Sequence, residues 1–198
     1  MNRMRLFLAG VGGQGTLTAT NLLSLTALDR NIDVCSGEIH GMAQRGGIVE
    51  STLLLGGYAS PRITSGEADI LLGFEPLETL RALHYLRPGG VIISNLEPTY
   101  PIGVSTGQET YPDLNLIKKR CLDCSKQSFF LPCKSLAAEA GTARAANIVL
   151  LGALAARTKS PFSLDDLKES VRRHLPDKIK AVNLKALDLG QRASEAEA

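Results

Sequence analysis

Short apolar segments alternate along this chain with longer segments of helical periodicity, and this alternation constrains the fold more than any other feature. We predict strands over residues 3–9, 32–37, 48–55, 70–73, 91–94 and 128–131. We predict helices over residues 16–28, 76–87, 113–125, 143–157, 164–175 and 176–191, with a frayed tail at 193–198. Strands that alternate with helices are typical of an α/β protein with a largely parallel sheet.

One connection departs from a purely parallel arrangement. Only a short loop separates the strand over 32–37 from the strand over 48–55, whereas a parallel crossover needs about a dozen residues or more. These two strands are therefore expected to run antiparallel, or else to lie in different parts of a mixed sheet. The sequence predicts a three-layer α/β/α sandwich with a Rossmann-like, mixed but mostly parallel sheet. We expect a single domain over 1–198, in which the C-terminal helices begin at about residue 143.

Composition excludes several classes of partner. The 198 residues carry a net charge of +2, aromatic residues make up 5%, and Trp is absent, so nucleic acid and membrane are not expected as partners. The N-terminal apolar run ends at Gly10, before it reaches the length of a signal-peptide core. A cytoplasmic protein with reduced thiols is expected. Cys121 and Cys124 form a C-x-x-C pair near Cys133 without a fourth local ligand, so we expect no metal site.

Residues 10–15, Gly-Val-Gly-Gly-Gln-Gly, satisfy the G-x-G-x-x-G pattern between a predicted strand and a predicted helix. Such a loop offers backbone N–H groups and the positive end of the helix to an anion, so Gly12, Gly13, Gln14 and Gly15 are candidate binding residues. Three interpretations stay open, namely a tight turn that binds nothing, an anion site and a dinucleotide site. A dinucleotide site also requires an acid about 20 residues further on, where Cys35 stands and Asp33 and Glu38 only flank it.

A second loop, His40 to Gly47, contains three glycines together with one imidazole, one amide and one guanidinium. Arg45 has the planar donor geometry that suits a carboxylate or phosphate, and His40 and Gln44 can add hydrogen bonds. Both loops are predicted at the carboxyl ends of strands, where α/β sheets tend to bind ligands. An exposed turn, or a surface that a partner subunit covers, is the simpler interpretation.

The two loops together resemble the gamma-type subunit of 2-oxoacid:ferredoxin oxidoreductases, and within it the beta-type subunits of the indolepyruvate branch. The resemblance rests on residues 10–15 and 38–47, with further matches at 69–78, 88–90 and 147–152, and it runs from about Arg3 to Gly152. Relatives that act on pyruvate or 2-oxoglutarate tend to carry Tyr-Gly-Pro where this chain has His40-Gly41-Met42, which favours an arylpyruvate substrate.

The resemblance implies a subunit that supports the oxidative decarboxylation of a 2-oxoacid to an acyl-CoA without carrying out the chemistry itself. No catalytic residue is expected on this chain. Thiamine diphosphate, Mg²⁺, iron–sulfur clusters and CoA are implied on an alpha-type partner subunit, which would pass electrons to ferredoxin. In this role Glu38, His40, Gln44 and Arg45 would contact substrate or partner, and the isolated chain could self-associate.

Two other functions remain compatible with the residues alone. An NAD(P)-dependent, Rossmann-like oxidoreductase would bind a dinucleotide at the first glycine loop without a partner. A stand-alone regulatory module would bind a small anion tightly and form no obligate complex.

Overall fold

The computed structural model describes residues 3–41, 47–157 and 160–196, and it contains one six-stranded sheet with the strand order β2-β3-β1-β4-β5-β6. β3 runs antiparallel to both of its neighbours, and the other pairings are parallel. The predicted antiparallel pair is therefore confirmed. The strands are β1 (Met4–Val11), β2 (Val34–His40), β3 (Ile48–Leu55), β4 (Ala68–Gly73), β5 (Leu86–Asn95) and β6 (Gln127–Leu131).

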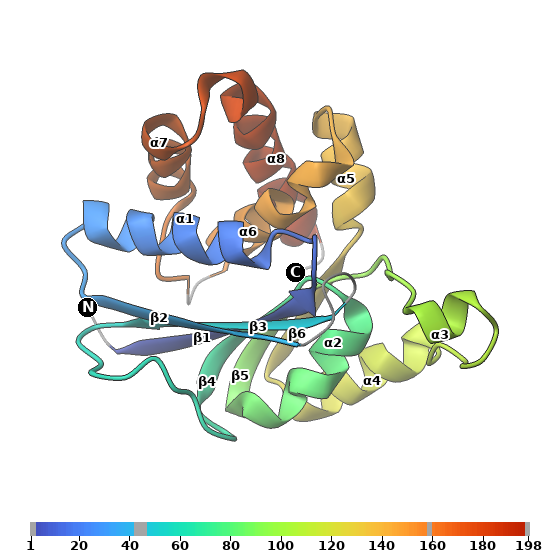
Figure 1. Ribbon diagram of the computed structural model, residues 1–198. Helices are drawn as coiled ribbons and strands as arrows, with labels where there is room; N and C mark the ends of the chain where they lie inside the picture. The colour runs from blue at the N-terminus through green and yellow to red at the C-terminus, as the bar shows by residue number, and fades with distance from the viewer. Residues whose placement is uncertain (1–2, 42–46, 158–159, 197–198) are drawn as a thin grey trace.

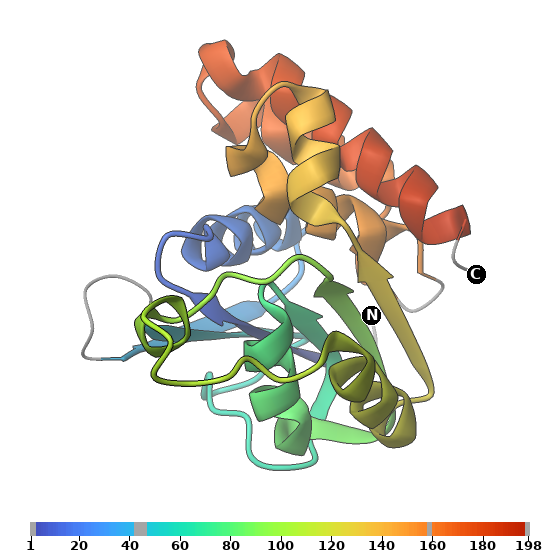
Figure 2. The same cartoon turned by 90° about the vertical axis from the view of Figure 1, so that its right-hand side faces the viewer.

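Helices cover both faces of this sheet, which confirms the predicted three-layer α/β/α sandwich (Figures 1 and 2). One face carries α1 (Thr16–Asp29), α5 (Cys133–Ala140), α6 (Ala146–Ala155), α7 (Leu164–His174) and α8 (Asp177–Ala196), as Figure 1 shows. The other face carries α2 (Pro76–Arg81) and α4 (Leu114–Cys124). The short helix α3 (Ile102–Ser105) stands away from the rest of the molecule.

The side chains of β1 show why the sheet needs cover on both faces. Leu6 and Leu8 are buried in the cluster beneath α1 and α6, whereas Phe7 and Ala9 are buried in the cluster on the opposite face. Successive side chains of a strand point to opposite faces, so an uninterrupted apolar run requires a packed layer on each side.

Helices α6 and α8 cross at unusually short range because each helix has a glycine that faces the backbone of the other helix. A Cβ atom on Gly152 would lie 2.1 Å from the Leu187 carbonyl oxygen, and one on Gly190 would lie 1.9 Å from the Val149 carbonyl oxygen. Even an alanine at either position would overlap main-chain atoms. This crossing holds α8 against α6, and α6 lies on the sheet.

The prediction of one long helix over 76–87 is wrong. Helix α2 ends at Arg81, a 3₁₀ turn follows (Ala82–Tyr85), and β5 begins already at Leu86. The Pro88-Gly89-Gly90 segment, predicted to stop a helix, lies inside β5 instead. There the register against β4 shifts, and Gly89 takes a positive φ of 73°. A bulge accommodates these residues in a strand.

Two further differences concern helices. Helix α5 falls where no element was predicted, and α8 continues to Ala196, beyond the predicted end at Gln191. The part of the expected frayed tail that the structure describes, to Ala196, is helical because Ser194 is buried, donates to the Ala153 carbonyl at 3.3 Å and accepts from Arg157 at its own carbonyl. By contrast, the predicted cap at Ser163 is confirmed as a capping box with Asp166.

Candidate functional site

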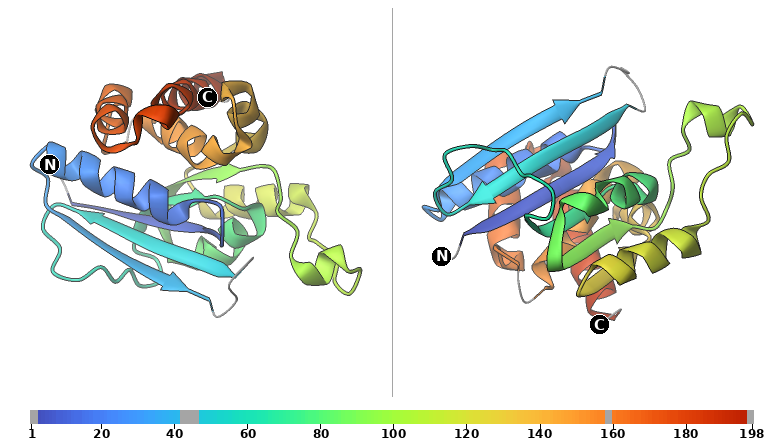
Figure 3. Two further views of the ribbon diagram at one scale, coloured as in Figure 1. Left: turned by 45° about the horizontal axis from the view of Figure 1, so that its top comes forward. Right: turned by 90° about the horizontal axis from the view of Figure 1, so that it is seen from below.

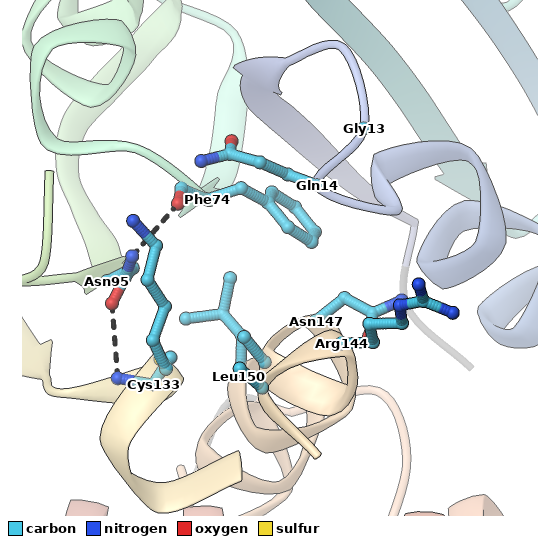
Figure 4. Close-up of a pocket in the computed structure, with 11 residues that line it drawn as sticks. Gly13, Gln14, Phe74, Asn95, Cys133, Arg144, Asn147 and Leu150 are labelled. Carbon is cyan, nitrogen blue, oxygen red and sulfur yellow. Dashed lines mark hydrogen bonds between the residues drawn. The ribbon is translucent and has the colours of Figure 1, made fainter. Parts of the chain in front are cut away.

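A cavity of about 270 Å³ opens at the carboxyl edge of the sheet, next to the gap between β1 and β4. The chain leaves β1 toward β2 on one side and leaves β4 toward β5 on the other, so the connections diverge at this gap. Crevices of this kind are the preferred ligand sites of open α/β sheets. The cavity, shown in Figure 4, is lined by Gly13, Gln14, Phe74, Asn95, Cys133, Lys134, Ala143, Arg144, Ala146, Asn147 and Leu150.

Two cations and an apolar floor give the cavity its chemical character. Nζ of Lys134 donates to the Pro98 carbonyl at 2.7 Å and to Thr99 Oγ1 at 2.9 Å, and no carboxylate of the described chain pairs with it. The exposed Arg144 guanidinium has no hydrogen-bond or ion-pair partner among the described residues. None of the described residues that line the cavity is acidic. It suits a ligand that joins an anionic group to an apolar body.

Phe74 and Leu150 supply that apolar floor. Leu150, from α6, projects into the centre of the cavity in Figure 4, and Phe74 follows directly after β4. Both side chains belong to the buried core, so the floor is an extension of the packed interior.

Asn95, the last residue of β5, joins the loops that surround the cavity. Its amide donates to the Phe74 carbonyl at 3.2 Å and to the Glu97 carbonyl at 2.8 Å. Its oxygen accepts from the Glu97 amide at 3.2 Å and from the Cys133 amide at 3.1 Å. Because Phe74, Glu97 and Cys133 follow three neighbouring strands, one buried side chain fixes the spacing of three strand ends.

The first glycine loop is already partly satisfied within the protein. The Gly12 amide donates to the Gly47 carbonyl at 2.9 Å, and the Gln14 amide donates to the Val11 carbonyl at 3.2 Å. The Gln14 side chain accepts from the Val11 amide at 3.0 Å and donates to Thr99 Oγ1 at 3.1 Å. Two of the four amides that the sequence suggested for anion binding are therefore in use.

Gly13 and Gly15 take the positive φ values, 95° and 76°, that this turn requires. No described residue accepts a hydrogen bond from either amide. Asn147 at the start of α6 donates to the Gly15 carbonyl at 3.2 Å, and a Cβ atom on Gly15 would lie 2.6 Å from Asn147 Nδ2. A glycine is needed at 15 so that α6 can approach the loop.

The two loops do meet at one edge of the sheet, as the sequence predicts, at the ends that the structure describes. Val11 pairs with Ile48, and the Gly12 amide bonds the Gly47 carbonyl. His40 ends β2 opposite Val49, although its side chain is not described. Gln44 and Arg45 lie outside the described residues.

Glu38 does not join the glycine loop at the first cavity. It lines a separate space of about 520 Å³ that also includes Glu50, Arg62 and His84. Among the predicted contact residues, Glu38 is the one whose side chain the structure places, and it lies outside the first cavity.

Lys134, Arg144, Asn95 and Phe74 were not predicted as site residues. Phe74 and Asn95 stand at or just after the carboxyl ends of their strands, and Lys134 lies three residues after the end of β6. These three residues could have been predicted by taking the residues at the carboxyl end of each parallel strand as candidates. Arg144 has no comparable marker.

Strand order argues against the dinucleotide interpretation. In a Rossmann half the strand that supplies the ribose-binding acid lies next to the first strand. Here β3 lies between β1 and β2, so Glu38, the acidic residue of β2, stands two strand spacings, about 10 Å, from β1.

Cys35 and Cys133 lie on β2 and α5, whereas Cys121 and Cys124 are about one turn apart on α4. Cys121 is buried and Cys124 exposed on α4, and burial raises the pKa of the Cys121 thiol to about 12. Within the described ranges, no three His, Cys, Asp or Glu residues are grouped as metal ligands would be. Nor does that part of the chain include a helix long and apolar enough to cross a bilayer.

Comparisons with known proteins give a consistent result. The family profile described as "Pyruvate ferredoxin/flavodoxin oxidoreductase" matches residues 5–193. "Indolepyruvate oxidoreductase subunit IorB" of Pyrococcus horikoshii is 40% identical over 197 residues, which cover 98% of both chains.

Solved structures share the fold. The gamma subunit of a keto/oxoacid ferredoxin oxidoreductase from Geobacter sulfurreducens has a TM-score of 0.70 at 21% identity, with 98% of this chain and 99% of that chain covered. The 2-oxoglutarate:ferredoxin oxidoreductase from Magnetococcus marinus, solved with 2-oxoglutarate, coenzyme A and succinyl-CoA, has a TM-score of 0.70 at 19% identity. That match covers 99% of this chain but 32% of the other.

Proposed function

Because this chain belongs to the pyruvate ferredoxin/flavodoxin oxidoreductase family, we propose that it is the subunit of a 2-oxoacid:ferredoxin oxidoreductase that carries neither thiamine diphosphate nor clusters. Indolepyruvate or another arylpyruvate is the proposed oxoacid. The observation that carries this proposal is the match, from end to end of both chains, to an indolepyruvate oxidoreductase subunit. A chain that matches 98% of such a subunit is expected to fill that subunit's place in a complex.

The cofactors belong, in this proposal, to an alpha-type partner subunit. Thiamine diphosphate with Mg²⁺ supplies the decarboxylation chemistry there, and iron–sulfur clusters carry the electrons to ferredoxin in the cytoplasm. The thiols of this chain suit cluster ligation poorly, because Cys121 and Cys133 are buried and, within the described ranges, no group of metal-ligating side chains forms.

The contribution of this chain is to bind and orient an anionic ligand beside the partner. Lys134 and Arg144 would meet the carboxylate of the oxoacid or a phosphate of CoA, while Phe74 and Leu150 support an apolar part of the same ligand. The amides of Gly13 and Gly15 remain available to the same ligand. Glu38, His40, Gln44 and Arg45 remain proposed contacts to substrate or partner.

A reconstituted complex tests this proposal. We would express the chain together with the thiamine- and cluster-carrying subunit of the same genome and measure indolepyruvate-dependent reduction of a viologen dye. We expect the partner alone to show little activity and the complex to restore it. Full activity of the partner alone would contradict the proposal and favour the stand-alone anion-binding module.

Charge removal in the cavity tests the ligand contact within that complex. Lys134→Ala and Arg144→Ala are each expected to lower the apparent substrate or CoA affinity about tenfold, since one charge-assisted hydrogen bond contributes roughly 1.5 kcal/mol. Lys119→Ala, on the exposed side of α4, is the matched control and should leave the affinity unchanged. If all three variants had the same apparent affinity, the proposal that the cavity binds the ligand would be wrong.

A further inference from the structure

Residues 98–112, here called the arm, make up most of the connection between β5 and α4. They project from the body at the carboxyl edge of the sheet. Figures 1 and 3 show this segment, with the short helix α3 at its tip, standing clear of both helical layers. Long segments that leave a compact fold usually serve recognition rather than packing.

Both ends of the arm are tied to one buried carboxylate. Oε1 of Glu75 accepts from the Thr99 amide at 3.2 Å and from the Tyr111 hydroxyl at 2.6 Å. Oε2 of the same side chain accepts from the Glu78 amide at 3.0 Å and caps α2. The Tyr100 ring packs edge-on against Tyr111, with 5.2 Å between the centroids. The arm is therefore held at its base by the core.

The arm is also ordered internally. The Ser105 amide donates to the Pro101 carbonyl at 2.9 Å, and the amides of Gln108 and Glu109 both donate to the Gly103 carbonyl, at 2.8 and 3.0 Å. A segment that is already folded loses little conformational freedom when it binds.

The surface of the arm is almost uncharged, and it presents two large hydrophobic side chains beside exposed polar ones. Ile102 is 76% exposed and Tyr100 is 57% exposed, and Glu109 is the only charged residue among 98–112. Exposed aromatic and branched side chains with little charge around them are typical of the buried centre of a protein interface. A membrane surface would instead be met by Lys and Arg, which the arm lacks.

The arm begins at the cavity. The Thr99 hydroxyl accepts from both Gln14 and Lys134, which line it. Further exposed hydrophobic residues lie along this edge, on the first turn of α1 and at the ends of β2 and β3, namely Leu17, Ile39 and Ile48. A body that received the arm would also cover the mouth of the cavity.

We propose that the arm is an anchor that inserts Ile102 and Tyr100 into an apolar recess of the cofactor-carrying partner subunit. The inference rests on the proposed function, which supplies a partner subunit at this edge. A preorganised, neutral segment with two exposed anchor side chains is suited to a stable complex between different chains.

The test compares three variants for binding to the purified thiamine- and cluster-carrying subunit, measured by biolayer interferometry. Ile102→Asp is expected to weaken binding at least about tenfold, and Ile102→Ser, which adds no charge, should weaken it in the same direction. Leu122→Asp is the matched control because Leu122 is 58% exposed on α4, away from the arm, and should bind like the wild type. Thermal unfolding of each variant checks that the fold is intact.

The outcomes separate this inference from the function on which it rests. A wild-type chain that does not bind the partner would overturn the proposed function and, with it, the anchor. Wild-type binding that Ile102→Asp and Ile102→Ser leave unchanged would overturn the anchor alone. If Ile102→Asp instead abolished a dimer of the isolated chain and left the complex intact, the arm would be a self-association element and the inference would be wrong.

Discussion

The crossing of α6 and α8 and the carboxyl edge of the sheet are built in opposite ways. At the crossing, two glycines bring backbone against backbone and leave no space for a methyl group. At the edge, a cavity, two cations without carboxylate partners among the described residues and a projecting arm leave contacts unmade. The difference shows that this chain places its packing away from the edge on which its function is proposed to depend.

The largest effect is expected where the backbones touch. In Gly190→Ala the new Cβ would overlap the Val149 carbonyl, which cannot move without shifting α6, so the loss of unfolding free energy should be about 3 kcal/mol or more. Gly66→Ala is the control, because a Cβ there meets nothing within 4 Å and only the φ of 76° opposes it, at about 1–2 kcal/mol. Urea unfolding followed by circular dichroism measures both. Equal losses would show that the crossing is not close-packed.

At the carboxyl edge of the sheet, a substitution at Asn95 is expected to lower the unfolding free energy by less than Gly190→Ala does. Asn95→Ala leaves the Cys133 and Glu97 amides and two carbonyls without their partner, which should cost about 2–3 kcal/mol. Asn183→Ala removes another buried amide, whose one hydrogen bond among the described residues goes to the Ile179 carbonyl of its own helix, so its cost should stay near 1 kcal/mol. If the two variants lost the same stability, the joining of three strand ends by Asn95 would not contribute.

The smallest effect concerns Glu78 and Glu67, two carboxylates whose pKa values shift in opposite directions. Burial raises the pKa of Glu78, and the nearby Glu75 adds to this, although Arg81 acts against it. Its ionised form is therefore disfavoured in the folded state, and the stability present below the unfolded pKa is lost as pH rises through the folded pKa. Glu78→Gln should equal or exceed the wild type at pH 7, by at most about 1 kcal/mol, and lose this advantage near pH 4.

Glu67 supplies the contrasting case. A backbone hydrogen bond from Thr64 lowers the pKa of Glu67, so its contribution is present at neutral pH and is lost as pH falls through the folded pKa. Glu67→Gln should therefore be no more stable than the wild type at pH 7. Denaturant titrations at pH 4 and pH 7 give the change in unfolding free energy of each variant relative to the wild type. If both variants were more stable, or both less stable, than the wild type at pH 7, the opposite pKa shifts of Glu78 and Glu67 would be contradicted.

Much of the fold was predictable because its signals are local. The apolar run around Leu71 requires cover on both faces, and the short span between Ile39 and Ile48 excludes a parallel crossover. Errors arose where one local pattern suits two structures. Pro88-Gly89-Gly90 ends helices in general, yet here it forms a bulge within β5 because β4 is available as a partner.

The candidate site was predictable only in part. The glycine loop was identified because strand, glycines and helix are adjacent in sequence. Its partners Lys134 and Arg144 come from segments more than 100 residues away, and only the strand order brings them to Gln14. That the Gly12 amide is already bonded, to the Gly47 carbonyl, likewise depends on β3 lying beside β1, which no local pattern records.

The Thr99 hydroxyl, which accepts from Gln14 Nε2 and Lys134 Nζ, has a thermodynamic consequence. A ligand that draws the Lys134 ammonium toward itself weakens the bonds from Nζ to the Pro98 carbonyl and the Thr99 hydroxyl, which help to hold the base of the arm. Conversely, a body that fixes the arm keeps that ammonium in place. Binding at the cavity and seating of the arm are then linked functions. Whatever free energy one event adds to or subtracts from the other, the reverse effect has the same size and sign.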